Sequence, residues 1–162
     1  MNQTIKKSRR KTRQCLFQAL YSCVFLKEKF DKQFFLESFF DEGFEGFLDD
    51  EFFDEIFSGV QEKEKELIYL VKKFAPKFDI GSMSLVNLIP VFISSYEQLF
   101  LKCDTIPFKV SIDEALELTK IYSDDQGRIL ANGILNSIKD NKETLLKEFQ
   151  DIKDAKTYFF NV

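Results

Sequence analysis

Six of the eight residues from Lys6 to Arg13 are basic. No acidic residue occurs before Glu28, so residues 1–27 carry a charge of +7, whereas the whole chain carries −4 and the remainder −11. A block of cations attracts polyanions, and nucleic-acid phosphates are polyanions that such side chains neutralise directly. The chemistry that this cluster predicts is therefore phosphate binding.

The basic cluster continues into QCLFQALYSCVFL, a segment with helical character. On a helix, Arg9 and Arg13 share a face because they are four residues apart, and Arg10 lies about 100° away. Gln18 and Tyr21 add hydrogen-bonding and stacking groups to the same element. A solvated basic tail is the alternative interpretation, but continuity with a rigid helix favours a surface that presents charges at fixed spacing.

The composition argues against catalysis and against a metal site. The chain has no histidine, which removes the commonest general base and the commonest metal ligand. Its three cysteines form no CxxC motif, and buried thiols in a reducing cytoplasm are the simplest interpretation. We therefore expect no catalytic residue, no metal and no cofactor.

The region from Asp31 to Glu55 has the opposite character to the amino terminus. It contains ten acidic residues, a single base and many phenylalanines. We expect the rings to form core and the acids to face water, where they would repel nucleic acid. A nucleic acid would then be directed to the amino-terminal end.

The elements that position these groups are all expected to be helices. The longest apolar stretch, 85–101, is interrupted by polar residues and by Pro90, so it does not predict a membrane span. No targeting segment is evident, and a cytoplasmic protein is expected. Ser111 with Glu114 predicts a capping box at the start of a helix. The expected helices are 10–27, 31–40, 50–57, 59–73, 85–103, 112–122, 128–139 and 142–153.

Two segments of the chain together resemble the NusB family. RRKTRQCLFQALYS, residues 9–22, is similar to the family's basic cluster followed by a QALY-type helix. IPFKVSIDEALELTKIYSDDQGRILANGIL, residues 106–135, is similar to the family's P-[YF]-K-V-x-I-[ND]-E-A stretch with its following loop and NG[VI]L helix. The second segment is long and specific, and the resemblance spans residues 9–138.

The resemblance implies an all-α, NusB-like fold of two three-helix bundles in a single compact domain with about seven helices. Residues 1–8 would be a flexible basic start, 9–140 the helical domain, and 141–162 a polar carboxy-terminal helix or tail. The implied function is transcription antitermination, without enzymatic activity. The protein would bind boxA-type single-stranded RNA jointly with the small-subunit ribosomal protein NusE. As part of an RNA polymerase antitermination complex it would modulate elongation and termination, notably in ribosomal RNA operons.

Carried over residue by residue, the family's RNA-facing surface falls on two stretches. Leu130 stands where the family usually has an aromatic residue, and a leucine offers no π face to a base, a contact worth about 1–3 kcal/mol. The amino-terminal residues are therefore expected to carry a larger share of the binding. Gln126 replaces a common acid, which removes repulsion from phosphate. The expected RNA-binding residues are Arg9, Arg10, Lys11, Arg13, Gln18, Tyr21, Tyr122, Gln126, Leu130 and Asn132.

Other interpretations remain open. Residues 87–92 lack the charged landmarks of the corresponding family helix, which lies near the side that binds NusE. With the acidic, Phe-rich segment, this motivates a helical protein-interaction adaptor with little or no RNA binding. NusB-like domains also occur fused to RNA cytosine methyltransferases, but this chain is too short to hold a cofactor-binding domain. Some members of the family dimerise, so the resemblance leaves a homodimer open.

Overall fold

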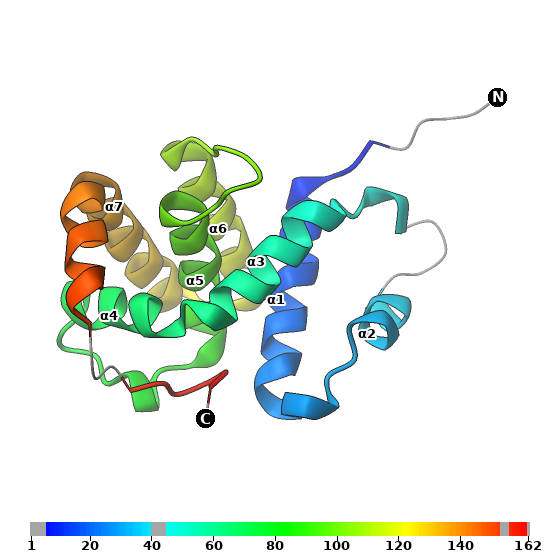
Figure 1. Cartoon of the computed structure of the whole chain (residues 1–162), viewed down its shortest axis with the longest axis horizontal. Coiled ribbons are helices and arrows are strands. Elements are labelled where there is room, and N and C mark those ends of the chain that lie inside the picture. Colours follow the sequence, from blue (N-terminus) through cyan, green and yellow to red (C-terminus); the bar gives the residue numbers. More distant parts are fainter. Residues whose placement is uncertain (1–5, 40–44, 153–155, 162) are drawn as a thin grey trace.

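The computed structural model describes residues 6–39, 45–152 and 156–161 (Figure 1). Residues 1–5 of the expected flexible basic start lie outside the described residues. The part that is described contains seven α-helices and no strand, which confirms the all-α expectation. The helices are α1 (Arg9–Leu26), α2 (Lys32–Phe39), α3 (Asp50–Glu62), α4 (Glu64–Phe74), α5 (Leu85–Leu99), α6 (Phe108–Tyr122) and α7 (Asp125–Glu148). Short 3-10 turns are η1 (Lys27–Lys29), η2 (Glu45–Phe47), η3 (Ile80–Ser82) and η4 (Phe149–Asp151).

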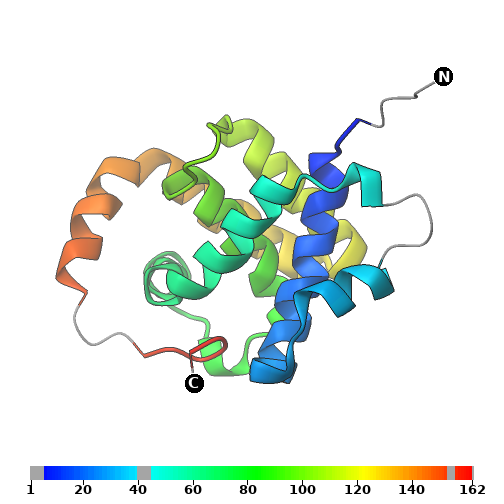
Figure 2. The ribbon, with the colours of Figure 1, turned by 45° about the vertical axis from the view of Figure 1, so that its right-hand side comes forward.

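Helix α5 lies at the centre of the fold. It packs between α6 and α7 on one side and contacts α1 and α3 on the other (Figures 1 and 2). Every residue from Leu88 to Leu99 is buried, including the polar ones. A helix that is apolar nearly all round belongs inside a core, which explains the longest apolar stretch of the sequence. Among the described residues, no helix combines the length and the apolar character that a membrane crossing requires.

The predicted capping box at Ser111 and Glu114 is wrong. Helix α6 begins three residues earlier, at Phe108, after Pro107 in an extended conformation. Ser111 is buried inside the helix, where its hydroxyl lies 2.7 Å from that of Ser94 on α5. The tertiary partner uses the hydroxyl that the local pattern had assigned to the cap.

Two other boundaries differ from the prediction. The break predicted between the helices at 50–57 and 59–73 does not occur at Ser58. Helix α3 continues to Glu62, and only the non-helical Lys63 separates it from α4. Helix α7 starts at Asp125 and runs to Glu148, with one non-helical residue at Asn141. That residue lies within the gap predicted between the last two helices.

The end of the chain returns to the first half of the molecule. The Glu64 side chain on α4 is buried and accepts hydrogen bonds from four successive backbone N–H groups, those of residues 158–161. The ring of Phe159 packs against that of Phe92 on α5, with centroids 6.1 Å apart. The carboxy-terminal residues are therefore tied to α4 and α5, far away in sequence.

Candidate nucleic-acid interface

The first turn of α1 presents the basic cluster at a helix amino terminus. Ser8 is the N-cap residue, and its hydroxyl accepts a hydrogen bond of 3.2 Å from the backbone N–H of Lys11. No acidic residue lies in this turn. The free N–H groups of a helix start carry partial positive charge, so cations here are locally unfavourable and anions are favoured. The arrangement costs helix stability and favours an anion near this end of the helix.

Carboxylates from other elements face two of these arginines. Arg9 donates to Asp49 at 3.2 Å and to Asp104 at 2.5 Å. Arg10 makes a two-fold contact with Glu114 on α6, at 3.2 and 3.0 Å. The hydrogen bond from Arg9 holds the pKa of Asp104 below its ordinary value. Both arginines remain partly open to solvent, with 34% and 61% of their side chains exposed.

Arg13 has a different environment from Arg9 and Arg10. Its side chain is only 4% exposed and makes two hydrogen bonds, of 2.9 and 2.7 Å, to the Glu97 carboxylate on α5. Burial raises the pKa of Glu97, and the bonds from Arg13 oppose that rise. Arg13 thus joins α1 to the central helix, and the structure does not bring its guanidinium to the surface beside Arg9.

Lys11 lies beside Arg9 and Arg10, which are both partly exposed. Its ammonium group stands 3.9 Å from the centre of the Phe47 ring, in a cation–π contact. This contact places the Lys11 side chain against η2, which lies at the same end of α1 as Asp49. The exposed Lys6 and Lys7 precede the helix. The cations of residues 6–11 therefore gather at one end of the molecule.

Gln18 and Tyr122 connect α1 with the end of α6. The amide of Gln18 donates to the Tyr122 hydroxyl at 2.9 Å, and the Tyr122 ring stacks on Phe17 with centroids 4.1 Å apart. Tyr21, one turn further along α1, is 39% exposed. The structure thus brings together three of the predicted residues from segments about 100 positions apart.

A tight junction between α6 and α7 positions the remaining candidates. Asp124 caps α7 by accepting the backbone N–H of Gly127 at 2.9 Å. A Cβ atom at Gly127 would lie 2.0 Å from the Ser123 hydroxyl and 2.5 Å from the Asn87 side-chain oxygen, so a larger residue there would have to displace both side chains. The first turn of α7 is thereby held against α5, with Gln126 on its exposed side.

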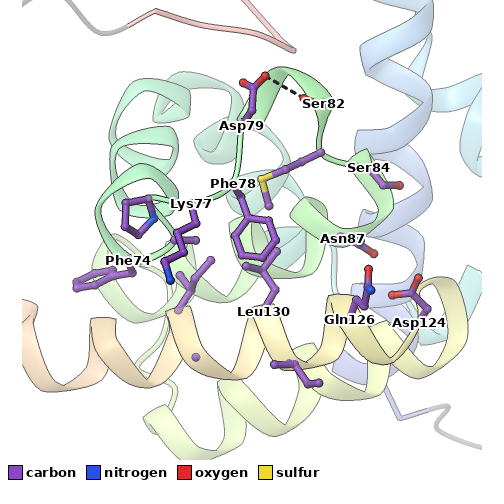
Figure 3. A pocket seen from close by; sticks show the side chains of 16 residues that line it. Phe74, Lys77, Phe78, Asp79, Ser82, Ser84, Asn87, Asp124, Gln126 and Leu130 are labelled. Atoms are coloured by element: carbon purple, nitrogen blue, oxygen red, sulfur yellow. Dashed lines mark hydrogen bonds between the residues drawn. The ribbon is translucent and has the colours of Figure 1, made fainter.

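A groove lies between the first half of α7 and the segment that joins α4 to α5 (Figure 3). Its volume is about 1020 Å³, and Gln126 and Leu130 both line it. Asn132 does not line it, and its side-chain oxygen accepts a hydrogen bond of 3.0 Å from Asn136. Two residues along a helix point to nearly opposite sides, which separates Asn132 from Leu130.

Sequence reasoning missed the other wall of this groove. Lys77 and Phe78 are exposed and line it opposite α7. The one local signal was an apolar ring directly after Ala75-Pro76-Lys77, in a stretch that proline marks as a loop. The carboxylates that face Arg9 and Arg10 were also missed, because they lie 40 to 104 residues away in sequence.

Comparison with known proteins gives consistent results. The NusB family model matches residues 10–140. A transcription antitermination protein NusB of Clostridium perfringens is 38% identical over 85 residues, which cover 52% of this chain and 62% of that protein. One from Clostridium novyi is 28% identical over 134 residues, covering 81% of this chain and 97% of the relative. A solved structure of T. maritima NusB superposes with a TM-score of 0.70 at 27% identity, over 88% of this chain and 99% of that one.

Proposed function

The chain belongs to the NusB family, whose curated members are named transcription antitermination proteins, and from this premise we propose that it binds boxA-type single-stranded RNA. The same comparison confirms the expected NusB-like fold. The alignments with the first relatives span only about 60% of those proteins, as in the 62% for Clostridium perfringens. Substrate and partners are therefore inferred from the site.

One observation carries the RNA proposal. The first turn of α1 combines a helix amino terminus with Arg9, Arg10 and Lys11 and contains no acid of its own. The carboxylates that offset these charges come from other elements through partly exposed ion pairs. Exposed ion pairs contribute little net stability, so a phosphate can replace them at small cost. A guanidinium fork binds phosphate in the same two-fold geometry that Arg10 now makes with Glu114.

The placement of the other candidates supports one path for the RNA. From the basic turn, the strand would pass Tyr21 and the Gln18–Tyr122 pair and reach Gln126 at the start of α7. Unstacked bases are recognised by aromatic faces and by amide hydrogen bonds, and these residues supply both. Arg13 acts in this proposal by fixing α1 on α5, since its guanidinium is already engaged by Glu97.

The protein partner is part of the same proposal. The protein would act in the cytoplasm with NusE, as a component of the RNA polymerase antitermination complex that works on ribosomal RNA operons. The altered residues 88–92 are buried inside α5 and so present no side chain to such a partner. Asn87 is half-buried and accepts a hydrogen bond from Ser123. These departures from the family pattern are thus compatible with an intact partner surface.

A fluorescence titration with labelled boxA-like RNA at several salt concentrations, with and without NusE, tests the proposal. Replacing Arg9 and Arg10 by alanine should weaken binding, and each lost phosphate contact should reduce the salt slope by about 0.7. Replacing the exposed Lys65 and Lys139 by alanine is the charge-matched control. Equal affinity and slope for the wild type and the double-arginine variant would reject the basic turn as the RNA site.

The second candidate is a protein-interaction adaptor without RNA binding. It is favoured by Phe34 on α2, which leaves 71% of an apolar side chain exposed within the acidic segment. The same titration separates the two candidates. The adaptor predicts no RNA affinity even when NusE is added, with purified NusE still bound after nuclease treatment.

A further inference from the structure

The groove beside α7 contains an exposed aromatic ring that no part of the RNA proposal has used. Phe78 leaves 56% of its side chain exposed, and Figure 3 shows its ring directed toward Leu130 across the groove. Ile129, with 73% exposed, adds a further apolar side chain. Large apolar side chains exposed together on one concave surface mark a binding site more often than chance.

The loop that carries Phe78 is held in place at both ends. The backbone N–H of Phe78 donates to the carbonyl of Ala75 at 3.1 Å, which closes a turn just after α4. On the other side, the Asp79 carboxylate accepts from the Gly81 backbone at 3.1 Å and from the Ser82 hydroxyl at 2.9 Å. Ile80 is buried and anchors the loop in the core. The ring is thus presented to solvent by a fixed turn.

The polar groups of the groove suit the edge of a nucleobase. Gln126 is exposed at one end, and the Asn87 amide lies near it with its oxygen already bonded to Ser123 (Figure 3). The acid at this end, Asp124, is engaged in capping α7. Lys77 is exposed beside Phe78 and places a cation at the groove, within the reach of its flexible side chain. A base requires an apolar face and hydrogen-bonding edges, and this groove offers both.

The α7 side of the groove has room for a flat ring. Gly133 lines the groove, and a Cβ atom added there would meet nothing within 4 Å. A side chain can therefore be introduced at this position without a clash in the protein. A larger residue would fill the groove itself.

We propose that this groove binds one unstacked base of the RNA, stacked on Phe78 and held at its edge by Gln126 and Asn87. This inference rests on the proposed RNA binding and extends it to a specific site. Gln126 lies in the first turn of α7, which begins three residues after Tyr122, so the groove extends the proposed surface that begins at the basic turn. Phe78 supplies, from a different element, the π face that Leu130 lacks.

The test is a titration of single-stranded boxA-like RNA in which each nucleotide in turn is made abasic. Phe78→Ala removes the platform, and Gly133→Leu fills the groove and replaces a helical glycine by a better helix former. Each variant should bind RNA without an abasic position about 5- to 150-fold more weakly than the wild type does, which is the loss expected for one base–aromatic stack. Phe78→Tyr keeps an aromatic face and should bind the same RNA about as tightly as the wild type does. Phe34→Ala, which removes an exposed ring on α2 outside the proposed RNA surface, is the matched control for binding of RNA in the absence of NusE.

The position of the base supplies the decisive comparison. One abasic position should weaken wild-type binding as much as Phe78→Ala does, and should cost nothing further in that variant. If the wild type binds the RNA and both groove variants bind it with an affinity within twofold of the wild type, the inference is overturned and the proposed function stays intact. A loss seen only when NusE is present would equally overturn it, because it would assign the groove to a protein. No RNA binding by the wild type would instead reject the proposed function itself.

Discussion

Replacing Glu64 by glutamine should detach the carboxy-terminal residues from the core. Both carboxylate oxygens are in use: one accepts the backbone N–H groups of Tyr158 and Phe159 at 2.7 and 2.8 Å, the other those of Phe160 and Asn161 at 2.9 and 3.0 Å. Glutamine has nearly the same size but keeps only one acceptor. Its NH₂ group would face two N–H donors that it cannot satisfy.

The expected magnitude follows from these bonds. A hydrogen bond to a charged group contributes about 1.5–3 kcal/mol, so two lost bonds set an upper value near 6 kcal/mol. The segment can instead leave and bond to water, which limits the loss to its own docking free energy. That docking also includes the Phe159–Phe92 contact and the bond from the Asn161 amide to the carbonyl of Gln61 at 2.8 Å. We expect a decrease of about 2–4 kcal/mol in the free energy of unfolding.

Urea denaturation measures this loss, and carboxypeptidase digestion reports release of the segment. Deleting residues 156–162 should cost about as much as Glu64→Gln, and the substitution should add nothing in the shortened chain. Glu62→Gln, at an exposed neighbouring position, is the control and should change stability little. A loss from Glu64→Gln that persists undiminished in the shortened chain would refute the assignment of Glu64 to the carboxy terminus.

Three further predictions concern other charged groups. Glu114→Gln releases Arg10 and should raise RNA affinity about two- to fivefold in the titration, with a steeper salt slope; lower affinity would contradict the exchange of carboxylate for phosphate. Arg13→Ala leaves the Glu97 charge buried and should lower the free energy of unfolding by about 3–5 kcal/mol in urea, whereas RNA binding per folded molecule keeps its salt slope. Burial opposes ionisation of Glu55, but hydrogen bonds from two backbone N–H groups and a tyrosine hydroxyl outweigh it and lower its pKa below 4.5. Its contribution is therefore present above pH 4.5 and lost as the pH falls through the lowered pKa, so Glu55→Gln should flatten the acid limb of a stability–pH curve.

The helices were predictable because their apolar spacing is a local property. The failures occurred where a distant partner decided the outcome. Ser111 fits a capping pattern, but the Ser94 hydroxyl, 17 residues earlier, holds it inside α6. The spacing of Arg9 and Arg13 correctly placed them on one helical face, yet it could not say how far that face is covered. Helix α5 buries Arg13, whereas Arg9, at the amino-terminal end of α1, stays partly exposed to solvent.

The candidate site divides in the same way. The basic turn, Gln18 and Tyr21 were predicted from a continuous stretch of sequence. The resemblance added Tyr122 and Gln126 to the predicted site, and in the structure Gln18 bonds to Tyr122. Phe78 could not be found this way, because its loop meets α7 only through the packing of α4 and α5. The groove is a product of the tertiary structure.

The two kinds of arginine pair have different consequences for binding. A buried pair cannot exchange its carboxylate for a phosphate without leaving Glu97 charged and without a partner, so Arg13 is fixed in the fold. The pairs of Arg9 and Arg10 are open to water, and their carboxylates are resolvated when released. In the proposed RNA binding, these pairs would hold the guanidinium groups in ordered positions before RNA arrives, which would reduce the side-chain entropy lost on binding. In the proposed binding mode the carboxylates would also set a threshold, because a chain of linked phosphates makes several contacts at once and would displace them, whereas a single weak anion would not. Under this proposal, selectivity for a polyanion over a single phosphate would come from the same carboxylates that neutralise the basic turn.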